Sequence, residues 1–155
     1  MTSRAGPASR LAMTLTLSGT EHSVRLARQC AGLTLPGVGC LPSVVADAEA
    51  VLGELAGNAI RHTASGGPHG EFSVEIWQKL RDGRAVVFVA VHDQGSATCP
   101  QVRPVSETAE GGRGLLVVAG LAQRWGFTPK GTGCARMVWA ELDAGHGHGC
   151  PAGDA

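Results

Sequence analysis

Three side chains that can handle a proton or a metal ion recur at four-residue intervals in the middle of the chain. Glu54, Asn58 and His62 supply a carboxylate, a carboxamide and an imidazole. On a helix, residues four apart project from the same side, so these groups form one polar stripe. An amide oxygen in the stripe can bind a hydrated Mg2+, which takes few protein oxygens and relies on substrate phosphates. A solvated helix face is the alternative interpretation.

A second polar group stands at the end of an apolar run. The run AVVFVAV occupies residues 85–91 and is followed by His92, Asp93, Gln94 and Gly95. A carboxylate at the end of a buried strand can accept a hydrogen bond from an exocyclic amine such as that of adenine. Gly95 lets the backbone turn beside a flat ring. Taken alone, Asp-x-Gly is also a common turn.

Glycines cluster where an irregular segment runs into a helical pattern, at Glu110-Gly-Gly-Arg-Gly114-Leu-Leu. Glycines let backbone N–H groups approach phosphate oxygens, and the start of a helix adds partial positive charge. Arg113 can add a bidentate phosphate contact. A purely structural turn explains the same residues, so this pattern is not diagnostic by itself.

Hydrophobic periodicity predicts the elements that position the polar stripe. Residues 13–17 alternate apolar and polar, which is typical of a half-buried strand. Thr20 caps a helix that the Gly and Pro residues between 33 and 42 interrupt. The longest helical pattern opens at Pro42 and carries the stripe opposite a broad apolar face. That face consists of Val44, Ala48, Val51, Leu52, Leu55, Ala59 and Ile60.

The remaining elements follow a regular order. Strands at 71–79 and 85–92 flank an Asp-Gly turn, and the second is apolar enough to be central and buried on both faces. Residues 93–111 lack periodicity, as lids and binding loops do. A helix starts at Gly112, and a hairpin over 125–142 closes the chain. We therefore predict an α+β fold, a two-layer α/β sandwich whose mixed, mostly antiparallel sheet is covered on one face by three helices.

The composition is typical of one globular domain. A chain of 155 residues with 43% hydrophobic and 17% charged residues suits a single core. Because the formal net charge is zero, a direct nucleic-acid partner has little electrostatic support. No run approaches the ~20 apolar residues of a membrane helix. We expect a flexible leader at 1–10, the folded domain at 11–142 and a flexible tail at 143–155.

The cysteines give no sign of a disulfide framework. There are five, an odd number, without a Cys-x-x-Cys pair. This fits reduced thiols in a cytoplasmic protein better than disulfides or a zinc site. A metal site at His146, His148 and Cys150 is less favoured than a disordered terminus, because glycines surround these residues.

Together and in this order, the three motifs resemble the GHKL superfamily of histidine kinase-like ATPases. The helix from Glu54 to His62 is similar to its N box, and Asp93 to Gly95 is similar to its first Gly box. The second Gly box is matched by Gly112, Arg113, Gly114 and Leu115. Over residues 12–142 the chain looks most like anti-sigma-factor serine kinases of the RsbW type and small actinobacterial ATP-binding regulators. The fold implied is the Bergerat type.

The resemblance also implies a role for each motif, with ATP and Mg2+ as cofactors. Asn58 would coordinate the Mg2+ that bridges the phosphates, and Asp93 would recognise adenine. Residues 112–115 would close a lid over the triphosphate. Glu54 matches the general base of the kinase and ATPase members. His62 would lie near the phosphates, or serve only as a structural residue at the helix end.

The function implied is a serine/threonine protein kinase that phosphorylates an anti-anti-sigma partner and sequesters a sigma factor. A non-catalytic ATP-dependent binding module and an ATPase are the alternatives. The resemblance also implies a homodimer paired through the first strand, whose alternating pattern is that of a sheet edge in need of protection. One departure concerns the Thr that family members often carry before the closing strand. Here Arg136 or Met137 replaces it, which predicts reduced adenine affinity.

Overall fold

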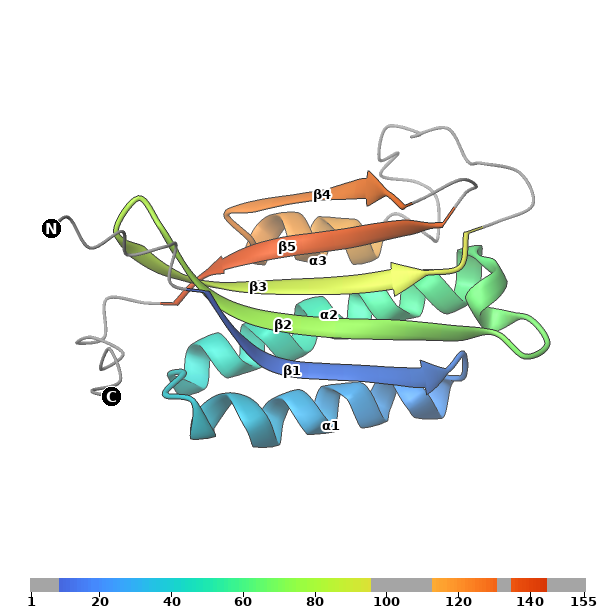
Figure 1. Ribbon diagram of the computed structural model, residues 1–155, viewed down its shortest axis with the longest axis horizontal. Coiled ribbons are helices and arrows are strands. Elements are labelled where there is room, and N and C mark those ends of the chain that lie inside the picture. Colours follow the sequence, from blue (N-terminus) through green and yellow to red (C-terminus); the bar gives the residue numbers. More distant parts are fainter. Residues whose placement is uncertain (1–8, 96–112, 131–134, 145–155) are drawn as a thin grey trace, which may run out of the picture.

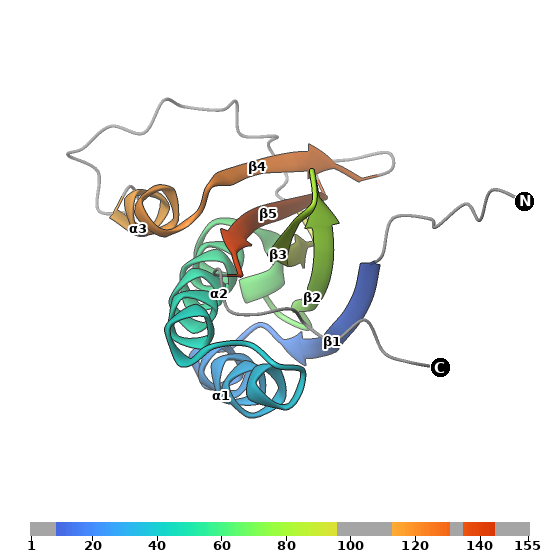
Figure 2. The same ribbon diagram turned by 90° about the vertical axis from the view of Figure 1, so that its left-hand side faces the viewer.

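The computed structural model describes residues 9–95, 113–130 and 135–144, which form two layers. A five-stranded sheet makes one layer, and three helices on one side of it make the other (Figure 1 and Figure 2). The strand order is β1-β2-β3-β5-β4, and each described pairing is antiparallel. The predicted α+β sandwich is confirmed. Its elements are β1 (Ser9–Ser18), α1 (Glu21–Gly37), α2 (Pro42–His62), the 3-10 turn η1 (Ala64–Gly66), β2 (Glu71–Arg81), β3 (Arg84–Asp93), α3 (Arg113–Leu121), β4 (Arg124–Pro129) and β5 (Arg136–Asp143).

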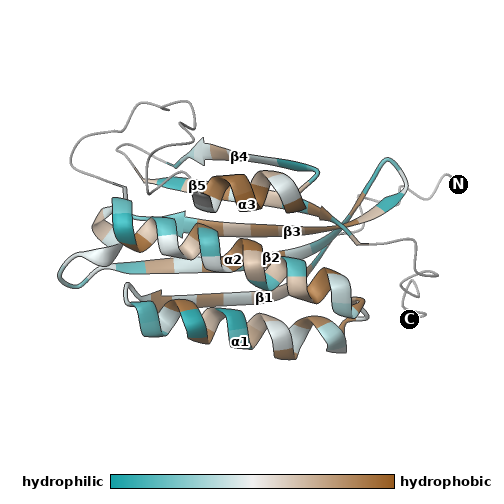
Figure 3. Cartoon of the chain, turned by 180° about the vertical axis from the view of Figure 1, so that it is seen from behind, coloured by the Kyte–Doolittle hydropathy of each residue, from teal (hydrophilic) through white to brown (hydrophobic). Residues whose placement is uncertain are grey.

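The longest helix, α2, packs its apolar side against the sheet, as predicted. Pro42 begins it, where a missing N–H costs nothing and the ring fixes a helical φ. Its outward side carries more polar residues, which appear teal from behind in Figure 3. None of the helices in the described residues is long and apolar enough to span a membrane. The buried side of α2 includes Val44, Ala48, Val51, Leu52, Leu55 and Ala59, while Ile60 is half-buried.

Helix α1 is longer than its sequence predicts. We expected the Gly and Pro residues from Leu33 onward to end it, but it continues to Gly37 and includes Pro36. The expectation was wrong because Leu35, four residues after the buried Ala31, is itself fully buried and extends the apolar stripe. Pro36 lies in the last turn, where it interrupts little of the hydrogen-bond ladder.

Two domain boundaries also shift. Ser9 and Arg10, expected in the leader, belong to β1 because they pair with Lys79 and Gln78 of β2. Asp143, expected in the tail, pairs with Val86 and ends β5. Residues 1–8 and 145–155, the latter with the His and Cys residues of the tail, lie outside the described residues. As expected, β1 is an edge strand, but pairing of two copies through it stays a prediction.

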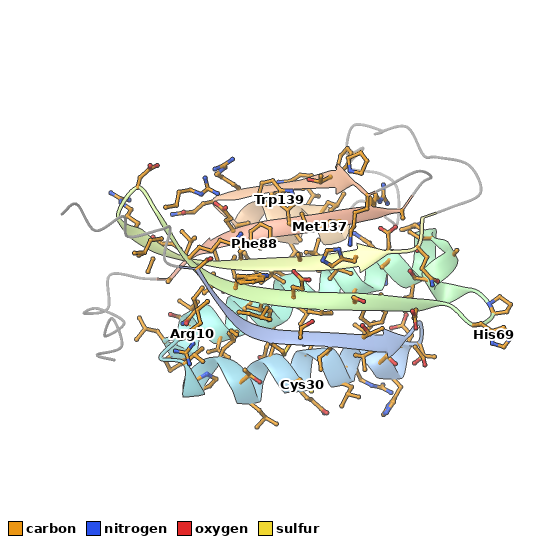
Figure 4. The ribbon with its side chains drawn as sticks, viewed as in Figure 1. Arg10, Cys30, His69, Phe88, Met137 and Trp139 are labelled. Carbon is orange, nitrogen blue, oxygen red and sulfur yellow. The ribbon has the colours of Figure 1, made fainter. Side chains whose placement is uncertain are left out.

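Strand β3 lies in the middle of the sheet, as its apolar sequence predicts. Val89 and Val91 are buried beneath the helices, and Ala90 is buried on the opposite face. On that open face the Phe88 and Trp139 rings stack with centroids 5.7 Å apart, and both lie in front of the sheet in Figure 4. Among the described residues, neither Cys30 nor Cys40 is in a disulfide.

His92 also faces the open side, one residue before the end of β3. Its Nδ1 lies 2.9 Å from Lys130 Nζ, so the ammonium donates and the ring carries its proton on Nε2. Burial, and then the Lys130 charge, lower the pKa of His92 below its ordinary value despite the opposing effect of Glu75. The Nε2 to Glu75 Oε1 distance of 3.6 Å is therefore a contact of a neutral ring at neutral pH, and not an ion pair.

This lowered pKa predicts a pH-dependent stability. Between the lowered value and the ordinary value of about 6.5, the unfolded chain binds a proton that the folded chain does not. The His92 contribution to stability is thus present above pH ~6.5 and is lost as the pH falls toward the lowered pKa. We expect His92→Gln to flatten the fall in unfolding free energy between about pH 7.5 and 5.5. Urea titrations at both pH values measure the unfolding free energy. If His92→Gln loses as much of it between the two pH values as the unchanged protein does, the role assigned to His92 is contradicted.

Candidate functional site

The polar stripe on α2 is present, but its three members differ in exposure. Glu54 and Asn58 are half-buried, whereas His62 is exposed at the last residue of the helix. Asn58 Oδ1 accepts a hydrogen bond from Arg61 Nη2 at 3.1 Å. Within the described residues His62 makes no side-chain hydrogen bond or ion pair, so the structure gives it no contact with the other two.

Asp93 is the buried carboxylate of the site. Its side chain is 2% exposed, at the end of β3. Oδ1 accepts the N–H of Gly95 at 2.8 Å, and the φ of 77° at Gly95 is one that glycine adopts without strain. Oδ2 accepts the Nε–H of Arg136 at 3.2 Å. The carboxylate is therefore held rigidly at the sheet end without being fully saturated, because each oxygen can accept more than one hydrogen bond.

The turn η1 fastens this strand end to the end of α2. The Ser65 hydroxyl is fully buried and accepts the N–H of Gln94 at 3.0 Å. Next to it, the Ala64 N–H donates to the Gly95 carbonyl at 2.5 Å. The motifs found in the sequence give the residues of this turn no role in the site. A serine beside two glycines was the available signal, but nothing local indicated its partner 29 residues away.

The first turn of α3 packs against the polar stripe. A β-carbon added to Gly114 would collide with Glu54 Oε2 and lie 3.7 Å from Asn58 Nδ2. With glycine at this position the Glu54 carboxylate can lie against the helix start, which brings the second glycine motif to the stripe. Arg113 is the first residue of α3, and Leu115 is half-buried. Gly112 and residues 96–111 of the predicted lid lie outside the described residues.

The register of β3 and β5 decides which residue replaces the expected threonine. Asp93 pairs with Arg136, whereas Met137 pairs with His92 on the opposite face. Met137 accordingly appears on the open side in Figure 4. Arg136 is thus the residue beside the carboxylate, and the ambiguity between 136 and 137 is resolved.

A groove of about 290 Å³ runs between α1 and α2 on the outer side of the stripe. Glu54, which is half-buried, is one of the residues that line it. Three arginines, Arg25, Arg28 and Arg61, and a second carboxylate, Glu21, also line it, so the cationic side chains outnumber the anionic ones by three to two.

The donor set suits magnesium better than a transition metal. No group of three or more His, Cys, Asp or Glu side chains that could hold a metal occurs in the described part of the chain. The amide oxygen of Asn58 is the kind of single protein ligand that Mg2+ accepts when phosphates and waters complete its shell. The close approach of Gly114 puts a helix start, which attracts phosphate, beside the Asn58 carboxamide, with Nδ2 as the nearer atom.

Comparison with protein families gives an independent result. Residues 17–139 match the family model of the histidine kinase-like ATPase domain, and this range contains the stripe, the strand end and the glycine motif. A search of curated proteins finds no match.

Proposed function

Because the chain belongs to the histidine kinase-like ATPase domain family and so carries an ATP-binding domain, we propose that it is a serine/threonine protein kinase. In this proposal a partner hydroxyl attacks the γ-phosphorus of ATP, the bond to the β–γ bridging oxygen breaks, and ADP leaves. The observation that carries the proposal is the contact of Gly114 with Glu54 and Asn58. It sets a carboxylate and a carboxamide beside the helix start at which phosphates are favoured.

Each residue has a part in this reaction. Asp93 accepts a hydrogen bond from the exocyclic amine of adenine, and Gly95 lets the chain turn beside the ring. Backbone N–H groups at the start of α3 hold phosphate oxygens, with Arg113 as the added cation. Asn58 Oδ1 would hold Mg2+, which when bound neutralises phosphate charge. Glu54 accepts the proton of the attacking hydroxyl.

The groove between α1 and α2 supports a protein substrate. Since Glu54 lines it, a hydroxyl on a partner segment can reach the carboxylate from outside. The groove arginines favour a partner segment with acidic residues. From the resemblance of the motifs, we propose an anti-anti-sigma protein as the phosphoacceptor and a sigma factor as the sequestered partner.

A non-catalytic module, in which ATP only orders the lid, is the second candidate function. The Arg61 hydrogen bond to Asn58 Oδ1 favours it, because a guanidinium beside the one proposed metal ligand opposes a divalent cation. Mg-ATP binding without phosphoryl transfer to candidate partners would select this candidate over the kinase.

Substitution of Asn58 tests the nucleotide site directly. We expect Asn58→Ala to weaken Mg-ATP binding about tenfold or more, since it removes the proposed metal ligand. Calorimetric titration of the full chain measures it. Gln29→Ala, at an exposed position on α1, is the control, and its affinity for Mg-ATP should stay within about threefold of that of the unchanged protein. Equal affinity of Asn58→Ala and the unchanged protein would contradict the assignment of the site.

Gly114 offers a separate test of the position of Glu54. The β-carbon of Gly114→Ala would meet the end of a flexible side chain, so we expect the Glu54 carboxylate to rotate away. Phosphoryl transfer should fall at least about tenfold. Unfolding free energy should stay level or rise by up to about 1 kcal/mol, because alanine favours the helix. Transfer rates and denaturant titrations measure both, and an unchanged rate would refute this role for the contact.

A further inference from the structure

Arg136 occupies an unusual position for an arginine. It stands directly opposite Asp93 on the neighbouring strand, and its Nε donates to Asp93 Oδ2 at 3.2 Å. In a strand, alternate residues face the same side. Asp93 thus faces the same side as Val91 and Val89, and Arg136 the same side as Ala140, all of them buried against the helices. The guanidinium therefore lies on the helix side of the sheet end, within the proposed nucleotide site.

Only part of the guanidinium is used by Asp93. An arginine has five N–H donors in one plane, and the contact with Asp93 takes the Nε–H. Within the described residues the Nη groups have no hydrogen-bond partner. The Arg136 side chain is 27% exposed against 2% for Asp93, so a ligand reaches the Arg136 side chain more easily than the carboxylate.

This pair presents a hydrogen-bond acceptor next to a row of donors. The edge of adenine carries the reverse pattern, because its exocyclic amine is a donor and the adjacent N1 is an acceptor. We propose that Arg136 donates to N1 of adenine while Asp93 accepts from the amine, so that Arg136 is a base-specificity residue. The inference rests on the ATP-binding part of the proposed function and is independent of whether transfer occurs.

Guanine is the informative competitor. It has a carbonyl in place of the amine and an N–H in place of the N1 acceptor, so in the same orientation both contacts become unfavourable. A site that left unpaired groups against guanine would discriminate strongly between the two bases.

The experiment removes the interaction from the ligand and from the protein in turn. Calorimetry compares Mg-ATP with Mg-1-deaza-ATP, in which N1 is replaced by C–H, for the unchanged protein and for Arg136→Met. We expect the unchanged protein to bind ATP about 10- to 100-fold more tightly than 1-deaza-ATP, as for a hydrogen bond to a charged group. Arg136→Met should bind ATP and 1-deaza-ATP with affinities within about threefold of each other. Lys130→Met, which removes a cation from the opposite face, is the control and should keep the full preference.

Several results would overturn the inference. One is equal binding of ATP and 1-deaza-ATP by the unchanged protein, a comparison that needs no variant to fold. Another is a full preference retained in Arg136→Met, or GTP binding as tight as ATP binding. If Arg136→Met does not fold because Asp93 loses its partner, the comparison of ATP with 1-deaza-ATP in the unchanged protein still tests the contact with N1. Failure of phosphoryl transfer would refute the kinase while leaving these affinities unchanged.

Discussion

Replacing Glu54 by glutamine is expected to lower the rate of phosphoryl transfer about 10²- to 10⁴-fold, the usual contribution of a positioned general base. Glutamine keeps the size of the side chain and its contact with Gly114, but it cannot accept a proton. Affinity for Mg-ATP should change by less than about threefold, because Glu54 is not proposed to hold the nucleotide. Transfer to the phosphoacceptor at saturating ATP measures the first quantity, and calorimetry measures the second.

The control for this variant is Glu49→Gln on the same helix. Glu49 lies against Gly32 of α1 and not against α3, since a β-carbon on Gly32 would meet its carboxylate. The Glu49→Gln variant should transfer the phosphoryl group at the rate of the unchanged protein. A Glu54→Gln protein that keeps its full rate shows that another group takes the proton. A protein that hydrolyses ATP without a partner, and loses this with Glu54, is an ATPase and not a kinase.

The parts of the fold that sequence predicted are those with local causes. The Thr20 hydroxyl caps α1 by accepting a hydrogen bond from the Ser23 N–H at 3.1 Å, and the two residues are three positions apart in the sequence. The Asp82-Gly83 dipeptide forms the hairpin turn between β2 and β3. The polar stripe and apolar face of α2 follow from helical spacing alone. Each of these features is determined by residues that lie only a few positions apart in the sequence.

The features that sequence did not reveal depend on contacts between distant segments. Burial of Leu35 extends α1 past its glycines, and this burial exists only once the sheet is in place. The pairing of Arg136 with Asp93 depends on the register of β3 and β5, and Met137 was an equal candidate until that register was known. The contact of Gly114 with Glu54 likewise joins two helices that are far apart in sequence. Motif order predicted a shared site, but not which atoms meet.

The turn after α2 depends on a close backbone contact of the same long-range kind. A β-carbon on Gly66 would collide with the backbone carbonyl of Ile60, and one on Gly19 or Gly70 with that of Ser65. The Gly19 N–H also donates to the Gly70 carbonyl at 2.9 Å, so the chain crosses itself here without side chains between. This crossing holds the Ser65 hydroxyl against the strand end that carries Asp93.

Gly66→Ala is therefore expected to lower the free energy of unfolding by about 3 kcal/mol or more, at the upper end of single-substitution effects. The obstacle is backbone and not the end of a flexible side chain, so relief requires the turn to move. Movement would also release the Gln94 N–H from Ser65, and we expect weaker Mg-ATP binding in the fraction that folds. Gly120→Ala in α3, where an added β-carbon meets nothing within 4 Å, should instead be neutral or stabilising by up to about 1 kcal/mol. Denaturant titrations of both variants measure the difference. Equal stabilities would mean that the turn can relax at no cost, in which case the crossing could not be what fixes Asp93 in place.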